Sequence, residues 1–120
     1  MSVNTFCHIE FQSTDMARTQ AFLEGMFGWH FRAFDDDMVV FGLGDEHLGG
    51  LTKVDRVEAG MSPTVWIQVA DLDGSLAKAE SLGGRIVHGR QPVPNVGWSG
   101  LIADQDGNHV GLVQFKEPGS

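Results

Sequence analysis

Two residues near the N-terminus have side chains that could do chemistry together. His8 and Glu10 are separated by one residue in the stretch TFCHIEFQ at 5–12. From Cys7 onward the stretch alternates between apolar and polar residues, which predicts a strand with His8 and Glu10 on the same face. Histidine titrates near neutrality and a partly buried carboxylate can be shifted toward it, so the pair is a candidate for acid–base catalysis. The plainer interpretation is that His8 only hydrogen-bonds a neighbouring polar group.

Other catalytic chemistries find little support. Cys7 is the only cysteine and falls on the strand face expected to be covered, with Ile9 and Phe11. A single cysteine allows no internal disulfide and no cysteine-built zinc site, which agrees with a reducing compartment. No serine lies in a Gly-x-Ser-x-Gly turn, and the glycines at 42–50 lack the Lys-Ser/Thr and the helix of a phosphate loop.

The elements that must position these residues occur in the same order twice. The expected elements are strands at 5–12, 29–34, 38–43 and 47–54 with a helix at 16–27, and then strands at 64–69, 85–90, 97–104 and 108–115 with a helix at 72–82. Each half therefore has the order β-α-β-β-β. The proline-rich QPVPN at 91–95 is expected to be a loop, because proline disrupts a central strand.

A shift of 56 residues superposes the two halves. It places Asp71 on Asp15, each at the expected start of a helix, and Gly84 on Gly28, each near its end. We interpret the chain as one domain made of two modules, residues 1–54 and 63–120, with a connector at 55–62. A length of 120 residues and 13.0 kDa suits one domain.

The charge of the chain excludes some partners. The formal net charge is -8 and the sequence pI is about 4.8, which is the wrong sign for nucleic acid or an anionic membrane. No apolar run approaches the ~20 residues of a membrane-spanning helix, and the N-terminus lacks the pattern of a signal peptide. We therefore expect a cytoplasmic protein.

Three stretches carry a resemblance to a known family. They are TDMARTQAFLEGMFGW at 14–29, VADLDGSLAKAESLGG at 69–84 and GWSGLIADQDGNHVGLVQ at 97–114. In combination they resemble the glyoxalase/bleomycin-resistance/extradiol-dioxygenase superfamily, also called vicinal oxygen chelate proteins. The resemblance implies an α+β fold in which two βαβββ modules form a curled mixed sheet, an incomplete barrel around a cleft, with the helices on the convex side. It also implies a homodimer.

In members of this family that use a metal ion, the first and last strands of each module supply the ligands. The matching positions here are His8, Gly50, Thr64 and Gly111. Three of these four positions depart from the family pattern, because threonine is a poor ligand and glycine has no side chain. We therefore expect no metal and no other cofactor. A divalent metal stays open as an alternative if His8, Glu10 and His109 converge.

The curl expected of the sheet would turn one polar, aromatic-containing face of the strands into the cleft. Flat rings there would give a small organic ligand a large contact area. The expected ligand-binding residues are His8, Gln12, Phe41, Thr64, Trp66, Gln68, Trp98 and His109. His30, His47 and His88 are expected to be ordinary strand or turn residues. The acidic charge weakly favours a cationic ligand.

Three functions follow as hypotheses. The first is a protein like the bleomycin-resistance proteins, binding a small organic molecule in the cleft without a metal. The alternative is an enzyme of the lyase, isomerase or dioxygenase type that uses His8 and Glu10, with or without a divalent metal. In the third, the protein is an accessory domain whose cleft is filled by Trp66 and Trp98.

Overall fold

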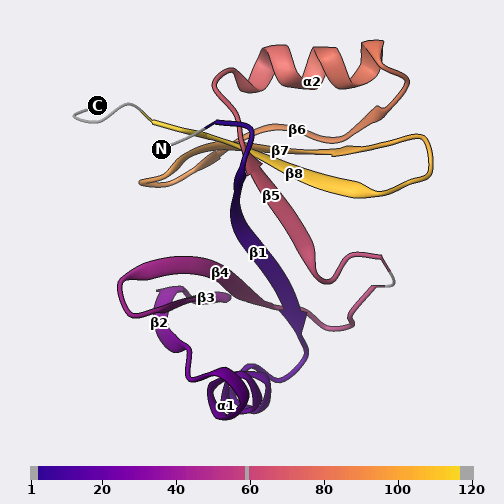
Figure 1. The fold of residues 1–120 in the computed structure, drawn as a ribbon. Helices are drawn as coiled ribbons and strands as arrows, with labels where there is room; N and C mark the ends of the chain where they lie inside the picture. The colour runs from indigo at the N-terminus through magenta and orange to yellow at the C-terminus, as the bar shows by residue number, and fades with distance from the viewer. Residues whose placement is uncertain (1–2, 59, 117–120) are drawn as a thin grey trace. The chain divides into compact units, whose positions relative to one another are not determined.

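The structure is a computed structural model that describes residues 3–58 and 60–116. It divides into two compact units, one formed by Cys7–Thr64 and the other by the residues up to Phe6 together with those from Val65 onward. The elements are β1 (Phe6–Ser13), α1 (Met16–Phe27), β2 (His30–Asp35), β3 (Met38–Leu43) and β4 (Glu46–Lys53), followed by β5 (Thr64–Gln68), α2 (Leu72–Ser81), β6 (Arg85–Val93), β7 (Gly97–Ala103) and β8 (His109–Phe115). The predicted repeat of βαβββ modules is confirmed (Figure 1).

The first module contains a four-stranded mixed sheet in the order β2-β3-β4-β1. β1 runs parallel to β4, and the β2–β3 and β3–β4 pairs are antiparallel. Helix α1 begins after Asp15, whose carboxylate accepts from the backbone N–H of Arg18 at 3.1 Å. It ends at Gly28, whose φ of 69° is the left-handed conformation that glycine adopts without strain. Both helix boundaries agree with the sequence prediction.

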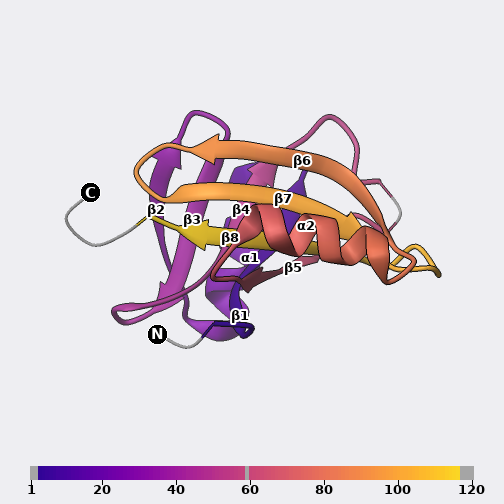
Figure 2. The same cartoon turned by 90° about the horizontal axis from the view of Figure 1, so that it is seen from above.

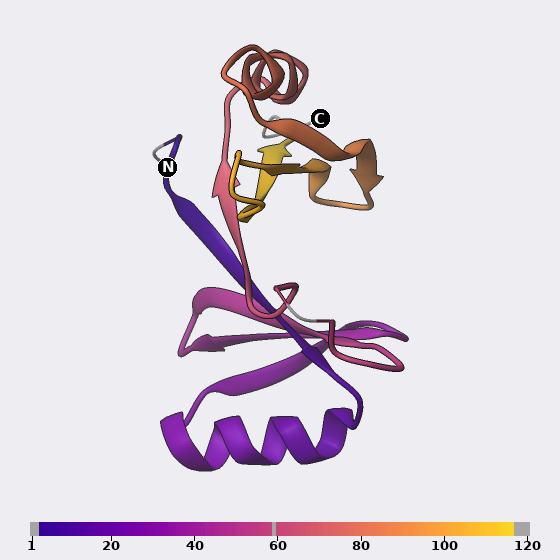
Figure 3. The same ribbon diagram turned by 90° about the vertical axis from the view of Figure 1, so that its right-hand side faces the viewer.

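Helix α1 covers one face of this sheet (Figure 3). The core there is aromatic: the Phe41 ring stacks on Trp29 with centroids 4.7 Å apart and also contacts Phe11 and Phe31. Ile9 lies on the same face but is 39% exposed, so this end of β1 is less covered than expected. We call the opposite face, which carries His8, Glu10 and Gln12, the helix-distal face of the first module.

The second module repeats this arrangement in the order β5-β8-β7-β6, with β5 parallel to β8. Helix α2 begins after Asp71, which accepts from Gly74 N–H at 3.1 Å. It lies over β6, β7 and β8 (Figure 2). The core between helix and sheet is formed by Val69, Leu72, Leu76 and Leu112, with Ile67, Ile86, Trp98, Ile102 and Val110 packed against it. The sheet face away from α2 is the helix-distal face of the second module.

The α+β class and the two modules with mixed sheets are as predicted. Most strand boundaries differ by one residue from those expected, and the largest difference is in β6, which continues to Val93 through Pro92, where the sequence suggested a loop. β6 is the last strand of its sheet, and an edge strand tolerates proline because one side makes no ladder hydrogen bonds. Within the part of the chain that the structure describes, no helix is long and apolar enough to cross a membrane.

Candidate functional site

The helix-distal face of the first module carries a chain of four hydrogen-bonded side chains. His8 Nε2 lies 2.5 Å from Glu10 Oε1, and Thr52 Oγ1 donates to Glu10 Oε2. At the other end, His8 Nδ1 lies 2.7 Å from His47 Nε2. The side chains of His8 and Glu10 are only 18% and 15% exposed. The predicted shared face of His8 and Glu10 is confirmed, and the two side chains are in direct contact.

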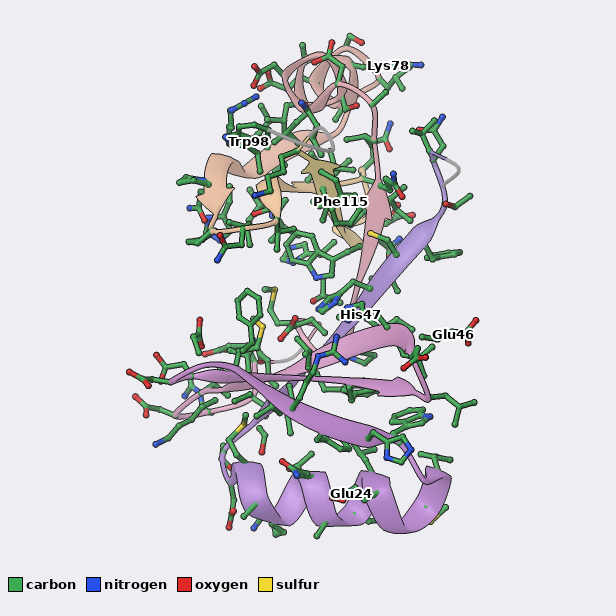
Figure 4. All side chains as sticks on the ribbon, turned by 90° about the vertical axis from the view of Figure 1, so that its left-hand side faces the viewer. Glu24, Glu46, His47, Lys78, Trp98 and Phe115 are labelled. Carbon is green, nitrogen blue, oxygen red and sulfur yellow. The ribbon has the colours of Figure 1, made fainter. Side chains whose placement is uncertain are left out.

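A β-bulge brings His47 to this face. Phe41 pairs with Gly49, whereas the next residue of β3, Gly42, pairs with His47, so β4 contains one extra residue here. In a regular strand His47 would point to the same face as Gly49, toward α1. The bulge reverses that direction, which is a known use of bulges beside functional sites. Figure 4 shows His47 on the side of the sheet away from α1.

Gly42 makes the bulge possible. A Cβ at this position would lie 1.7 Å from the backbone oxygen of Glu46, so only glycine allows the two strands to approach this closely. Alternation along the sequence does not predict His47 on this face, because counting alternate residues assumes a regular strand. The available signal was the glycine-rich segment GLGDEHLGG at 42–50, in which glycines mark bulges and close backbone approaches.

The two imidazole rings meet edge to edge. Their centroids are 5.0 Å apart and their planes differ by 17°, which is the arrangement expected when a 2.7 Å hydrogen bond joins nearly coplanar rings. Two proton patterns fit. A doubly protonated His8 donates to both Glu10 and His47, and His47 then carries its hydrogen on Nδ1. A neutral His8 donates only to Glu10 and accepts from His47 Nε2. In both patterns the Glu10 carboxylate only accepts.

The pKa of His47 is lowered from its usual value. Partial burial of the ring is the largest cause, followed by the positive charges of His8 and Arg32, while the Glu10 carboxylate opposes them. Arg32 comes from β2 and pairs with Val40, which pairs in turn with Gly50. It therefore lies on the helix-distal face as well. A lowered pKa keeps His47 neutral at neutral pH.

Gly50 lies directly beneath the His8–Glu10 pair. It is the register partner of Glu10 in β4, and a Cβ there would lie 3.0 Å from Glu10 Oε1 and 3.1 Å from His8 Cε1. Both distances are shorter than ordinary van der Waals contact. The space that a side chain at position 50 would need is thus taken by the pair.

The second module has a counterpart to this arrangement. Trp66 is the register partner of Gly111 in β8, and a Cβ on Gly111 would lie 2.2 Å from both Cδ2 and Cε3 of the indole. Trp66 corresponds to Glu10 under the 56-residue shift. Gln68 and His109 share this face by alternation along β5 and β8. Here an aromatic ring fills the space over the last-strand glycine.

The other predicted site residues have local structural partners. Gln12 Oε1 accepts from the backbone N–H of Glu58 at 3.4 Å, and its own backbone N–H donates to Ser62 Oγ at 3.0 Å. Thr64 is 7% exposed and its hydroxyl donates to the backbone oxygen of Met61 at 3.0 Å. These two residues hold the connector, and their contact with a ligand stays a prediction.

The expected positions of Trp98 and Phe41 are wrong. Trp98 pairs with Gln114 and packs against the core under α2, with the Arg90 guanidinium 4.6 Å from its ring centre. Phe41 is 2% exposed and lies in the aromatic core under α1. Both therefore lie on helix-covered faces. The register between strands decides this, because Gly111 pairs with Leu101 and not with Trp98.

The four family ligand positions do not fit a metal ion. His8 alone offers a ligating group, and both of its ring nitrogens are hydrogen-bonded to other side chains. The Thr64 hydroxyl is bonded to a backbone carbonyl, while the spaces over Gly50 and Gly111 are filled. Over residues 3–58 and 60–116, no three His, Cys, Asp or Glu side chains are grouped as a metal site would require.

Comparisons with known proteins agree with this fold. Methylmalonyl-CoA epimerase from Mycobacterium tuberculosis superposes with a TM-score of 0.70 and 18% identity, over 96% of this chain and 90% of that one. An extradiol ring-cleaving dioxygenase from B. fuscum gives 0.74 and 21%, over 97% of this chain and 34% of that one. The Mn(II)-bound glyoxalase from Novosphingobium aromaticivorans superposes with a TM-score of 0.71 and 16% identity, over 93% of this chain and 39% of that one. At these identities the likeness shows the fold alone, and this chain spans only about a third of the latter two.

A search of curated protein sequences finds no significant relative. The sequence model of the Glyoxalase/Bleomycin resistance protein/Dioxygenase superfamily, however, matches residues 5–112. That match extends over most of both modules and includes the first strands β1 and β5, which hold His8, Glu10 and Trp66. The chain therefore belongs to the Glyoxalase/Bleomycin resistance protein/Dioxygenase superfamily.

Proposed function

We propose that this chain binds a small organic molecule without the metal ion that other members of its family use. One observation carries the proposal: side chains from the neighbouring first strands fill the space over Gly50 and Gly111, at two of the four ligand positions. A metal-coordinating side chain at position 50 would displace the His8–Glu10 pair, and one at position 111 would displace the Trp66 indole.

Each helix-distal face offers a ligand different contacts. In the first module, Thr52, Glu10, His8 and His47 present hydrogen-bonding groups. In the second module, Trp66 presents a flat apolar ring, with Gln68 and His109 on the same face. Each face is a candidate contact surface by itself. Phe41 and Trp98 lie on the helix-covered faces and belong to neither surface.

Binding can be tested by thermal shift and calorimetry with a small-molecule panel, in buffer with and without EDTA. We expect ligands whose affinity is unchanged by EDTA and weakened by Trp66→Phe. Trp98→Phe is the matched control, because it makes the same change on the helix-covered face of the same module. Binding that requires an added divalent ion, or that both variants weaken equally, would contradict the proposal.

A second candidate function is acid–base catalysis of the isomerase or lyase type. The observation that favours it is the unbroken hydrogen-bond chain from Thr52 through Glu10 and His8 to the exposed His47. Each Glu10 oxygen keeps a lone pair with which to remove a proton from a carbon next to a carbonyl, leaving the electron pair as an enolate. The protonated Glu10 would then return the proton to a carbon of the enolate, which completes an isomerisation, while the Nε2–H of His8 holds the carboxyl group in place. A dioxygenase reaction is not proposed, because it needs a metal that these residues do not fit.

Deuterium exchange tests this candidate directly. The wild-type protein should speed the exchange of the acidic C–H in a hemithioacetal or α-keto substrate, and His8→Ala should abolish the effect. Turnover of epoxides and catechols should be measured as well, because the lyase, isomerase or dioxygenase alternative includes reactions of these compounds. Exchange rates that are identical for wild type, His8→Ala and buffer would contradict the catalytic function, and only the proposed binding function would remain.

We also propose that the protein is a homodimer in a cytoplasmic setting. β2 and β6 are each paired on one side only among the described strands, and an unpaired sheet edge invites association. Light scattering at micromolar concentration should give the mass of two chains. A monomer at that concentration would contradict the homodimer.

A further inference from the structure

We infer that two copies of this chain associate through helix α1, with the two α1 helices antiparallel and crossing at Ala21. The inference rests on the homodimer proposed above and names the surface through which the two copies meet. We call this surface the outer face of α1. It consists of exposed residues of the helix: Ala17, Arg18, Ala21, Phe22, Glu24 and Met26.

Helix α1 leaves large apolar side chains in contact with water. Leu23 is the one buried residue among the twelve of this helix. Phe22 and Met26 are one turn apart, so their side chains are neighbours on the helix surface. They are 64% and 59% exposed. Single exposed apolar residues are common on proteins, but neighbouring large ones indicate an interaction surface.

The equivalent part of α2 is different. The 56-residue shift that superposes the modules places Phe22 on Lys78 and Met26 on Leu82. Leu82 is also exposed, at 66%, but its neighbour is the charged Lys78, as is usual for a helix that faces water. Both helices cover a sheet of the same topology, so the fold itself does not require an apolar residue at position 22. Contact with a second copy supplies a reason for it.

The charges on the outer face of α1 are complementary to those of a second copy. Arg18 and Glu24 lie three residues on either side of Ala21. In an antiparallel pair related by a twofold axis at Ala21, Arg18 of each copy therefore lies level with Glu24 of the other. A parallel pair would place like charges together. Within residues 3–58 and 60–116, Arg18 and Glu24 form no ion pair, and Ala21 is small enough for close approach of the helices.

The sheet edges are the other surface at which two copies could meet. The β2 ladder is irregular between Ala33 and Asp35, and the β6 ladder is irregular at two places and contains Pro92. Bulges and proline hinder the addition of another strand to an edge. A ladder between two copies would therefore be short. The outer face of α1, by contrast, is continuous over roughly three helical turns.

Exchange of the charges at positions 18 and 24 tests the inference. Sedimentation equilibrium at low ionic strength gives the dissociation constant of the wild-type dimer. Arg18→Glu and Glu24→Arg each place like charges together at two points of the dimer, and each should raise this constant about tenfold. The double variant Arg18→Glu/Glu24→Arg should return it to within about threefold of wild type. Glu24→Arg makes the net charge of -8 less negative, so general charge repulsion would predict the opposite change for this variant.

The apolar part of the surface needs a second variant. Phe22→Lys copies the residue of α2 at the equivalent position and should raise the dissociation constant at least about a hundredfold, because two rings leave the interface. Circular dichroism should show that it folds, since Phe22 is mostly exposed. Lys78→Glu is the control, as a charge reversal at the equivalent position of α2, and should leave the dissociation constant unchanged.

The possible results separate this inference from the proposed homodimer. The inference is overturned if the double variant associates more weakly than both single variants, or if Lys78→Glu acts as strongly as Arg18→Glu. A dimer that no α1 variant weakens would also overturn it, but the homodimer would remain and the sheet edges would be its surface. A wild-type monomer would contradict both.

Discussion

The two modules have the same order of elements and the same pairing of first and last strands, yet they use one equivalent position differently. Glu10 pairs with Gly50 in the first module, and Trp66 pairs with Gly111 in the second. Over Gly50 lies a charged, hydrogen-bonded pair, and over Gly111 lies an indole ring. A repeated backbone therefore positions polar chemistry in one module and an apolar surface in the other.

The difference extends to the neighbouring hairpins. In the first module the β3–β4 ladder contains the bulge that turns His47 toward His8. In the second module the β7–β8 ladder is regular from Gly97 to Ala103. The polar chain thus depends on an irregular hairpin, whereas Trp66 needs only a glycine opposite. Substitutions at three glycines can break or sharpen this comparison, and their effects should rank by what each added Cβ would meet.

The largest effect is expected for Gly42→Ala. Its Cβ would lie 1.7 Å from the Glu46 backbone oxygen, and a backbone atom cannot rotate away, so the bulge itself must change. We expect a loss of at least about 3 kcal/mol in the free energy of unfolding, measured by urea denaturation. Gly25→Ala is the control, since nothing lies within 4 Å of its Cβ and alanine favours a helix. If Gly42→Ala lowers the free energy of unfolding by less than Gly111→Ala does, the bulge is not needed for the stability of the first module.

Gly111→Ala should rank second. Its Cβ would overlap the Trp66 indole at 2.2 Å, so the ring must leave its place, at a cost of about 2 to 3 kcal/mol. Trp66 fluorescence, isolated by replacing Trp29 and Trp98 with phenylalanine, should shift to longer wavelength as the ring gains exposure. An unchanged emission spectrum would show that the ring does not lie over Gly111.

Gly50→Ala should have a smaller effect, about 1 kcal/mol. Its Cβ would meet the end of the Glu10 side chain at 3.0 Å and the His8 ring at 3.1 Å, and the carboxylate can move by rotation. The NMR signals of His8 and His47 should shift while the unfolding midpoint changes little. A loss as large as that of Gly111→Ala would abolish the distinction between the modules.

The smallest effect concerns pH. The pKa of His47 is lowered in the folded state from 6.5, the value expected for an unfolded chain. As the pH falls below about 6.5 the unfolded chain binds this proton first, so the contribution of His47 lowers stability toward acid. His47→Gln should therefore lose less stability than wild type on going from neutral to mildly acidic pH. NMR titration of the His47 ring should give a midpoint below 6.5; a higher midpoint would contradict the arrangement of charges around it.

Much of this structure follows from periodicity and the resemblance. Alternation in β1 gave the shared face of His8 and Glu10, and Asp15 and Asp71 marked both helix starts. Pairing between strands was beyond such counting. Parity within one strand leaves its register open, so Trp98 and Phe41 were assigned to the wrong face, and the bulge at Gly42 hid the role of His47. The predictions were wrong where the direction of a side chain depends on how two strands pair.

The central claim is that this chain binds its ligand without a metal ion. Titration of protein purified without chelators against Mn(II), Ni(II) and Zn(II), with elemental analysis of the untreated sample, tests it most directly. We predict substoichiometric metal in the untreated protein. We also predict that none of the three ions shows saturable binding that depends on His8. One equivalent of metal per chain, lost in His8→Ala, would contradict the account.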